Sequence, residues 1–214
     1  MKNIGKKFGW SLVFILAILI VLASARFFFQ DFKAASPEFG PKFERHIAVF
    51  LIHISGGMIA LLVGPVQFLK GLRIRYPIAH RFLGRVYMLG VLAGGLAGLY
   101  LATASLGGLP THLGFGALAV LWLASAFMAF NHIRQGDVQA HRQWMIRNYS
   151  LTFAAVTLRL ELPLLIVAGL KFERAYILVS WLCWLPNILV VEAYLRNLKS
   201  RNKVNEPLGE LASP

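Results

Sequence analysis

All six histidines of the sequence fall inside or at the ends of four long apolar stretches. Three of them open the pattern His-x-x-x-Gly, as His53 with Gly57, His80 with Gly84 and His112 with Gly116. On a helix, position i+4 lies beside position i, so each glycine leaves space next to an imidazole ring. A flat macrocycle standing beside the histidine would need this space.

The histidines form two layers if the apolar stretches cross a membrane. The outer layer holds His46, His53 and His112, and the inner layer holds His80, His132 and His141. A ring-shaped ligand between helices is a common use of bundle cores, and histidine is a usual axial ligand of haem iron. For any single histidine, a structural hydrogen bond is the alternative, and we assign this role to His46 and His132.

Several arginines accompany the histidines. Arg81, Arg85, Arg142 and Arg147 surround the inner layer. They could hold haem propionates through charge-assisted hydrogen bonds, or they could anchor anionic lipid head groups. Arg159 falls near the middle of the fifth apolar stretch, where a cation is costly and usually has a partner or a task. We expect Arg159 to face the interior of the bundle and to contact a polar group or a ligand carboxylate.

The elements that carry these residues are apolar enough to span a bilayer. Hydrophobic residues make up 57% of the 214 residues, and charged residues only 14%, whereas about a quarter are charged in soluble domains. Six stretches reach the roughly 20 residues that a spanning helix needs: 8–29, 46–69, 86–106, 113–131, 149–169 and 176–195. We predict an all-α, six-helix membrane domain over residues 1–199, with spans two to five as its four-helix core. Residues 200–214 are predicted to form a disordered cytoplasmic tail.

The net charge of +13 indicates a topology rather than nucleic-acid binding. Fifteen of the 22 lysines and arginines lie at 1–7, 70–85, 134–147 and 196–203, which fall on one side of a six-span topology. By the positive-inside rule, that side and both termini are cytoplasmic. We expect a multi-pass protein of the bacterial inner membrane, in contact with lipid and not with nucleic acid.

Cysteine usage and the N-terminus leave one alternative open. Cys183 is the only cysteine, so a disulfide framework and covalent haem attachment through Cys-x-x-Cys-His are both excluded. Ala23-Ser24-Ala25 follows a basic and then an apolar segment, which resembles a signal-peptide cleavage site. The apolar run continues through residues 27–29 and is long enough to span, so we favour retention of this helix over its cleavage.

Three motifs carry a resemblance to a known family: Gly64-Pro65-x-Gln67-Phe68, His80-Arg81-x-x-Gly84-Arg85-x-Tyr87 and His141-Arg142-x-Trp144-Met145-x-Arg147. From about residue 46 to 163 the chain resembles the bacterial predicted-membrane-protein family designated domain of unknown function 2306. This resemblance implies a membrane protein and no particular activity.

The layout also resembles the six-helix, two-haem cytochrome b family that moves electrons from ascorbate across membranes. In that family, helix two pairs with helix four and helix three with helix five. The resemblance therefore implies that His53 pairs with His112 and that His80 pairs with His141. The chain departs from that family because His112 and His141 lie at span edges and no ascorbate-site motif is present.

These observations favour a protein that binds one or two b-type haems and relays electrons across the membrane, as a transmembrane oxidoreductase or electron carrier. A quinone or another small molecule would be the electron donor or acceptor. The alternative is a non-catalytic membrane protein without a cofactor, either a small permease or an assembly factor. A metal site without porphyrin is disfavoured because only Glu161 and Glu192 are acids within spans. The oligomeric state stays open.

Overall fold

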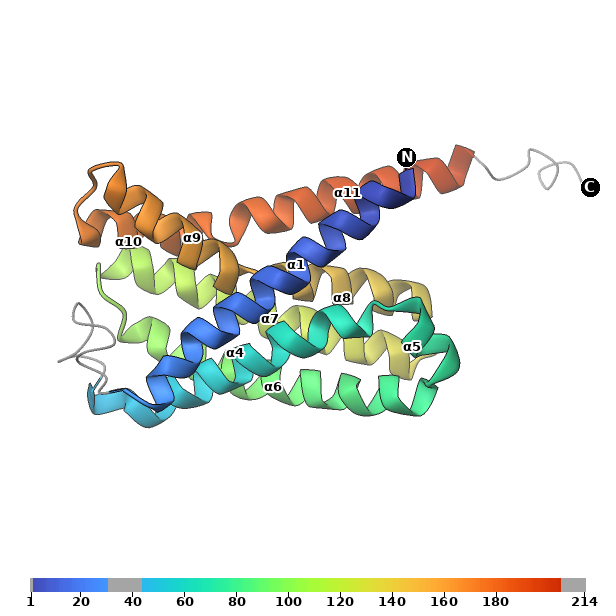
Figure 1. The fold of residues 1–214 in the computed structure, drawn as a ribbon, viewed down its shortest axis with the longest axis horizontal. Coiled ribbons are helices and arrows are strands. Elements are labelled where there is room, and N and C mark those ends of the chain that lie inside the picture. The colour runs from blue at the N-terminus through green and yellow to red at the C-terminus, as the bar shows by residue number, and fades with distance from the viewer. Residues whose placement is uncertain (1, 31–43, 205–214) are drawn as a thin grey trace, which may run out of the picture.

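The computed structural model describes residues 2–30 and 44–204, and these residues form an elongated helical bundle (Figure 1). The first part of the chain comprises α1 (Lys2–Ala25), η1 (Arg26–Phe28), η2 (Glu44–His46), α4 (Ile47–Gln67), α5 (Lys70–Arg75) and α6 (Pro77–Thr103). It is followed by α7 (Leu109–Arg134), α8 (Val138–Thr152), α9 (Ala154–Val167), α10 (Phe172–Leu182) and α11 (Leu185–Val204).

Six helical segments within the described residues are long and apolar enough to cross a membrane, as the sequence predicts. The fifth combines α8 with α9, and the sixth combines α10 with α11. Large apolar side chains such as Leu89, Phe127 and Leu164 are about two-thirds exposed. An outer surface of this composition is suited to lipid rather than water. The protein is therefore a multi-pass membrane protein in contact with the bilayer.

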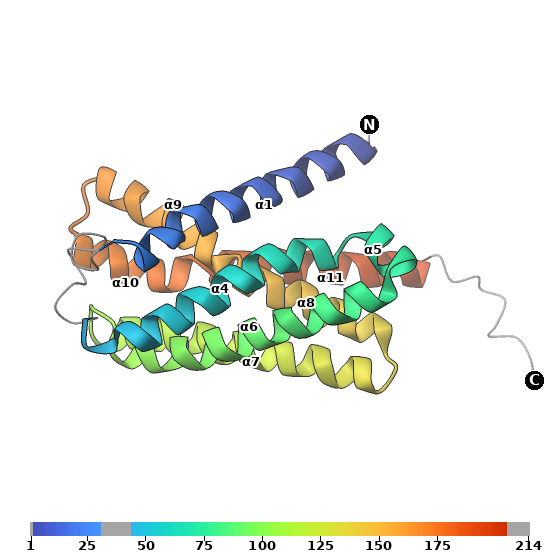
Figure 2. The same ribbon diagram turned by 60° about the horizontal axis from the view of Figure 1, so that its bottom comes forward.

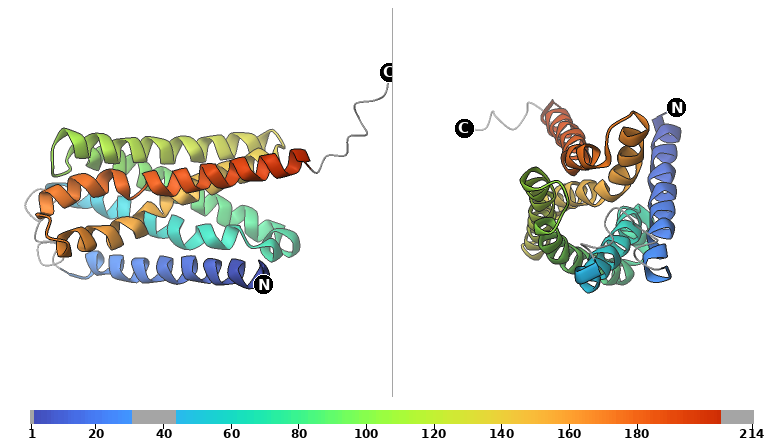
Figure 3. Two further views of the ribbon diagram at one scale, coloured as in Figure 1. Left: turned by 90° about the horizontal axis from the view of Figure 1, so that it is seen from above. Right: turned by 90° about the vertical axis from the view of Figure 1, so that its left-hand side faces the viewer.

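Spans two to five form a closed ring of four helices, which confirms the predicted core. Helix α4 packs against α6, α6 against α7, α7 against α8, and α8 against α4. Helix α1 lies outside this ring against α4 and α9, and its N-terminal half diverges from the bundle (Figure 2). Helix α10 packs on α7 and α9, and α11 packs on α8, so the ring is covered on one side (Figure 3).

Glycines set the close approach of α4 and α6. A Cβ atom added at Gly56 would lie 2.6 Å from the backbone nitrogen of Gly94 and would also collide with the carbonyl oxygen of Gly90. Small residues at helix contacts allow backbones in membranes to approach in this way. Gly90 and Gly94 of α6 therefore serve the packing of the two helices.

Two helices begin at residues that favour a helix start, whereas the last span contains a break that its continuous apolar run does not predict. Pro77 is the first residue of α6, and the side chain of Asp137 caps α8 by accepting a hydrogen bond of 2.8 Å from the backbone nitrogen of Ala140. The sixth span is interrupted between α10 and α11 at Cys183 and Trp184. Pro186 explains the break because it has no N–H to bond to the carbonyl four residues earlier.

The two ends of the bundle differ in character. The end formed by α5, the start of α6 and the α7–α8 turn carries most of the arginines named above, and we call it the basic end. The α6–α7 and α9–α10 turns lie at the opposite end (Figure 1). Helix α11 continues to Val204, and the rest of the predicted disordered tail lies outside the described residues.

Candidate cofactor-binding site

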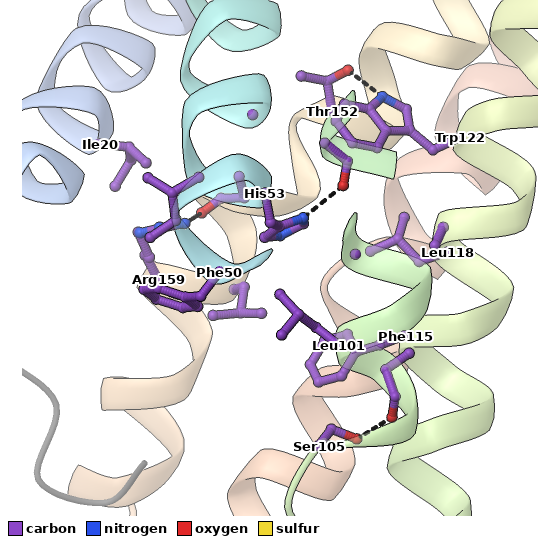
Figure 4. A pocket seen from close by; sticks show the side chains of 18 of the residues that line it. Ile20, Phe50, His53, Leu101, Ser105, Phe115, Leu118, Trp122, Thr152 and Arg159 are labelled. Carbon is purple, nitrogen blue, oxygen red and sulfur yellow. Dashed lines mark hydrogen bonds between the residues drawn. The ribbon is translucent and has the colours of Figure 1, made fainter. Parts of the chain in front are cut away.

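A cavity of about 590 Å³ lies between the helix ring and the helices α1, α9 and α10 (Figure 4). Its lining includes Ser105 and Tyr176, which lie toward the end opposite the basic end. Its volume falls within the range of about 300–1,000 Å³ that is usual for small-molecule sites. Side chains from α1, α4, α6, α7, α8, α9 and α10 line it. Most of them are apolar, including Phe50, Leu101, Phe115 and Leu118. The cavity is therefore suited to a largely apolar ligand.

His53 lines this cavity and is held in one orientation. Its Nδ1 lies 2.8 Å from the carbonyl oxygen of Gly94 on α6. A carbonyl can only accept, so Nδ1 carries the hydrogen and the lone pair of a neutral ring is on Nε2. Among the described residues, Nε2 has no hydrogen-bond partner. Metal-binding histidines commonly have their other ring nitrogen anchored in this way.

Glycines shape the space around His53. A Cβ atom added at Gly98 would lie 2.8 Å from His53 Nδ1, so Gly98 admits the ring between α4 and α6. Gly57, one turn after His53, also lines the cavity, and a Cβ atom there would meet nothing within 4 Å. Helix packing does not require this glycine. It leaves open space beside the imidazole, as the His-x-x-x-Gly pattern predicts.

Buried polar side chains close the cavity toward the middle of the bundle. Trp122 Nε1 donates to Thr152 Oγ1 at 2.8 Å, and both residues line the cavity (Figure 4). Behind them, Tyr87 donates to Asn148 Oδ1 at 2.6 Å, and Asn148 Nδ2 donates to Ser125 Oγ at 2.8 Å. Tyr87 and Asn148 are fully buried. These hydrogen bonds join α6, α7 and α8 and hold the side chains that form the floor of the cavity in fixed positions.

Arg159 faces the interior, as expected from its depth in the fifth span. Its Nη1 donates to the carbonyl oxygen of Ala155 at 2.9 Å, and its Nη2 donates to Ser24 Oγ on α1 at 3.0 Å. The side chain lines the cavity near Ile20 and Phe50 (Figure 4). The polar partner that the sequence could not name is therefore Ser24, on the first helix.

Arg26 is a cavity-lining residue that the sequence reasoning missed. Its guanidinium carbon lies 5.0 Å from the centroid of the Phe27 ring. Arg26 and Arg159 are also close enough for their like charges to repel. The position of Arg26 directly after the apolar run of the first span is the signal that could have singled it out.

His80 and His141 lie together at the basic end. The two rings are within electrostatic range of each other and of Arg73. His141 Nδ1 lies 2.8 Å from the carbonyl oxygen of Ala129 on α7, so its Nε2 carries the lone pair. His80 Nδ1 is buried and has no hydrogen-bond partner among the described residues. A Cβ atom added at Gly84 would have only Gln67 Oε1 within 4 Å, at 3.6 Å, which is an ordinary van der Waals contact.

The arginines of the basic end differ in their surroundings. Arg147 forms two hydrogen bonds with Glu192 of α11, at 2.5 and 3.1 Å, and its guanidinium carbon lies 4.8 Å from the centroid of the Trp144 ring. Its donors are thus already partly occupied by a carboxylate. Arg81, Arg85 and Arg142 are exposed. Their predicted contacts, whether with propionates or with lipid head groups, stay predictions.

Of the remaining histidines, His112 and His46 make hydrogen bonds, whereas His132 lies near a carboxylate without a hydrogen bond. His112 Nε2 donates to the carbonyl oxygen of Ser105 at 3.1 Å, and His112 is not among the cavity-lining residues. His46 Nδ1 lies 3.1 Å from the Tyr100 hydroxyl, and His132 Nδ1 lies 3.7 Å from Asp137 Oδ2. His80 and His141 interact electrostatically, whereas His112 lies outside the lining of the cavity that holds His53. Both axial pairings stay predictions.

No three histidine, cysteine or acidic side chains within 2–30 and 44–204 are grouped so that they could hold a bare metal ion. Residues 50–195 match the model of a family described as predicted membrane proteins, domain of unknown function 2306. This match covers more than half of the chain and includes the whole four-helix core except the start of α4. No curated protein and no solved structure gives a match.

Proposed function

Because the chain belongs to the family of predicted membrane proteins designated domain of unknown function 2306, whose name assigns no activity, we propose its function from the site. The protein binds b-type haem within its helix bundle and relays electrons across the bilayer. A haem held there supplies reversible one-electron transfer, while the protein supplies ligation, orientation and a dry environment.

The observation that carries this proposal is shared by His53 and His141. In both residues Nδ1 donates to a backbone carbonyl of a neighbouring helix at 2.8 Å, and Nε2 is left without a partner in the described structure. This arrangement fixes the ring and raises the basicity of the free nitrogen, which suits an axial ligand. The two residues lie in opposite halves of the bundle, as a relay across the membrane requires.

The surroundings of His53 fit a porphyrin. The cavity is apolar, has a suitable volume, and leaves open space beside Gly57 for a flat ring. The hydrogen-bonded Trp122 and Thr152 form its floor and separate it from the basic end. At about 1.5 Å per residue, His80 lies roughly 21 Å along α6 from Gly94, which accepts the hydrogen bond of His53. Tyr87 is midway between them and fully buried.

The location and direction of the relay are part of the proposal. The excess of lysine and arginine at the basic end supports a cytoplasmic position for that end, in a bacterial inner membrane. The cavity of His53 would then face the outer half of the bilayer. A quinone or another small molecule that reaches the cavity from the lipid or the outer surface would be the donor or acceptor.

The test is the haem content of the purified full-length protein, measured by reduced-minus-oxidised spectra. We expect the wild type to give the spectrum of low-spin b haem. His53→Leu and His141→Leu should each lose at least one haem per protein, since each removes an axial nitrogen. His46→Leu is the matched control and should keep the wild-type content, because His46 contacts Tyr100 outside the cavity.

Two results would contradict the proposal. A wild type that contains no haem after expression with an ample haem supply would favour a permease or assembly factor without a cofactor. Full haem content in both His53→Leu and His141→Leu would show that the anchored histidines are not ligands.

A further inference from the structure

The ionisable side chains of the cavity are unbalanced in charge. Among the described residues that line it, Arg26 and Arg159 are cationic, His53 and Tyr176 are titratable, and none is acidic. Arg159 lies within the fifth span, where a cation is costly, and the like charge of the exposed Arg26 nearby adds to this cost. An anion bound between them would remove this cost.

Arg159 has unused capacity for such an anion. Its two hydrogen bonds go to neutral oxygens, those of Ala155 and Ser24, and these occupy two of its five N–H donors. No carboxylate of the described chain forms an ion pair with it. Glu161, two residues further on, does not serve, because its Oε2 is buried without a partner and interacts electrostatically with Cys183.

Arg26 completes the arrangement from η1, directly after α1. Its guanidinium lies over the Phe27 ring, and Phe27 packs edge-to-face on Phe50 with ring centroids 5.2 Å apart. All three residues line the cavity. The positive charge is therefore concentrated where α1 meets α4 and α9. The walls toward Leu118 and Trp122 are apolar or uncharged.

We infer that Arg26 and Arg159 form a carboxylate-binding subsite, which holds the acid group of a ligand whose large apolar body extends toward Trp122. The inference deepens the proposed function, since haem carries two propionates on an apolar ring. A long-chain fatty acid offers the same chemistry from a different source. In both cases, the paired arginines select the acid over its neutral ester.

The haem arm of the test compares haem with its dimethyl ester, titrated into haem-free full-length protein. A charge-assisted hydrogen bond from arginine to carboxylate corresponds to a preference of about tenfold or more. Wild type should show this preference for the free acid, and Arg159→Gln and Arg26→Gln should lose most of it. Arg174→Gln is the matched control, because Arg174 is exposed in α10 and does not line the cavity.

The lipid arm uses spin-labelled stearate and its methyl ester in membranes containing the same variants, and it measures the immobilised fraction by electron paramagnetic resonance. The subsite is supported if stearate is immobilised more than its ester and if this difference is lost in Arg159→Gln or Arg26→Gln. This result supports the subsite even if haem does not bind. Arg26→Gln also covers the case in which Arg159→Gln fails to fold, because Arg26 is exposed.

The outcomes separate the two proposals. If only the wild type and Arg174→Gln prefer free haem over its ester, both proposals are supported. If haem and its ester bind with equal affinity, and stearate and its ester are immobilised equally, the carboxylate subsite is overturned. The haem proposal then still stands. Discrimination of stearate without any binding of haem overturns the haem proposal alone. Absence of discrimination in both arms, with no haem bound, overturns both.

Discussion

At the scale of single residues, the hydrogen bonds of the imidazole rings decide which nitrogen is left for a ligand. His53 and His141 use Nδ1 on backbone carbonyls and leave Nε2, whereas His112 uses Nε2 on Ser105 and leaves Nδ1. If His112 is the second ligand of the outer haem, it must bind through Nδ1 or give up the bond to Ser105. His53 needs no such change.

A substitution at Gly57 tests whether a ligand occupies the open space beside His53. Gly57→Ala adds a methyl group that meets no protein atom within 4 Å but enters the cavity beside His53. We expect the thermal stability of the haem-free protein to be unchanged and the haem affinity to fall about tenfold, from overpacking against the ring. Isothermal haem titration and thermal unfolding of the haem-free protein measure the two effects.

The control for Gly57→Ala is Gly71→Ala, since a Cβ atom at Gly71 of α5 also meets nothing within 4 Å and lies outside the cavity. It should leave both quantities unchanged. Equal haem affinity in Gly57→Ala and wild type would mean that the ring does not stand beside Gly57.

At the scale of elements, the contact between α4 and α6 positions His53. Gly56 packs on the backbone of Gly90 and Gly94, and Gly94 supplies the carbonyl that orients His53. Any separation of these helices would therefore lengthen the hydrogen bond that anchors the imidazole. The packing of the two helices and the orientation of the His53 imidazole depend on the same close approach.

Gly56→Ala tests this dependence. The added Cβ atom would lie 2.6 Å from the backbone nitrogen of Gly94, and neither backbone can yield as a side chain would. We predict a loss of about 1–3 kcal/mol in the free energy of unfolding, together with loss of the outer haem. Denaturant unfolding in detergent and haem content check the two results. A variant as stable as Gly57→Ala, with normal haem content, would contradict the prediction.

The sequence predicted the six spans because long apolar runs are local signals. It did not predict the break at Cys183 and Trp184, because the effect of Pro186 competes with a continuous apolar run. It also could not name Ser24 as the partner of Arg159, or Arg26 as a neighbour. These contacts join the first span to the fifth, and no spacing within one helix reports on them.

At the scale of the whole molecule, the distribution of charge sets the expected orientation. With fifteen of the 22 lysines and arginines on one side, the basic end should be cytoplasmic. A reporter active only in the periplasm should be inactive when fused after Arg75 and active when fused after Gly108, in the α6–α7 turn. The reverse pattern would invert the direction of the proposed relay.

Under the proposed function, the ring of four helices holds two separated histidine sites, one in each half of the membrane. His53 lies in the half toward the α6–α7 turn, whereas His80 and His141 lie at the basic end. The hydrogen-bonded layer of Tyr87, Trp122 and Asn148 separates the two. This layer would keep water from passing through the bundle while the two sites exchange electrons.

Transfer of electrons across a sealed membrane is the most direct measurement of this account. Purified protein is reconstituted into liposomes that contain ferricyanide, dithionite is added outside, and reduction of the trapped ferricyanide is followed by its absorbance. We predict rapid reduction with the wild type, and reduction no faster than in protein-free liposomes with His53→Leu or His141→Leu. If wild-type protein reduces the trapped ferricyanide no faster than protein-free liposomes do, the proposed relay is contradicted.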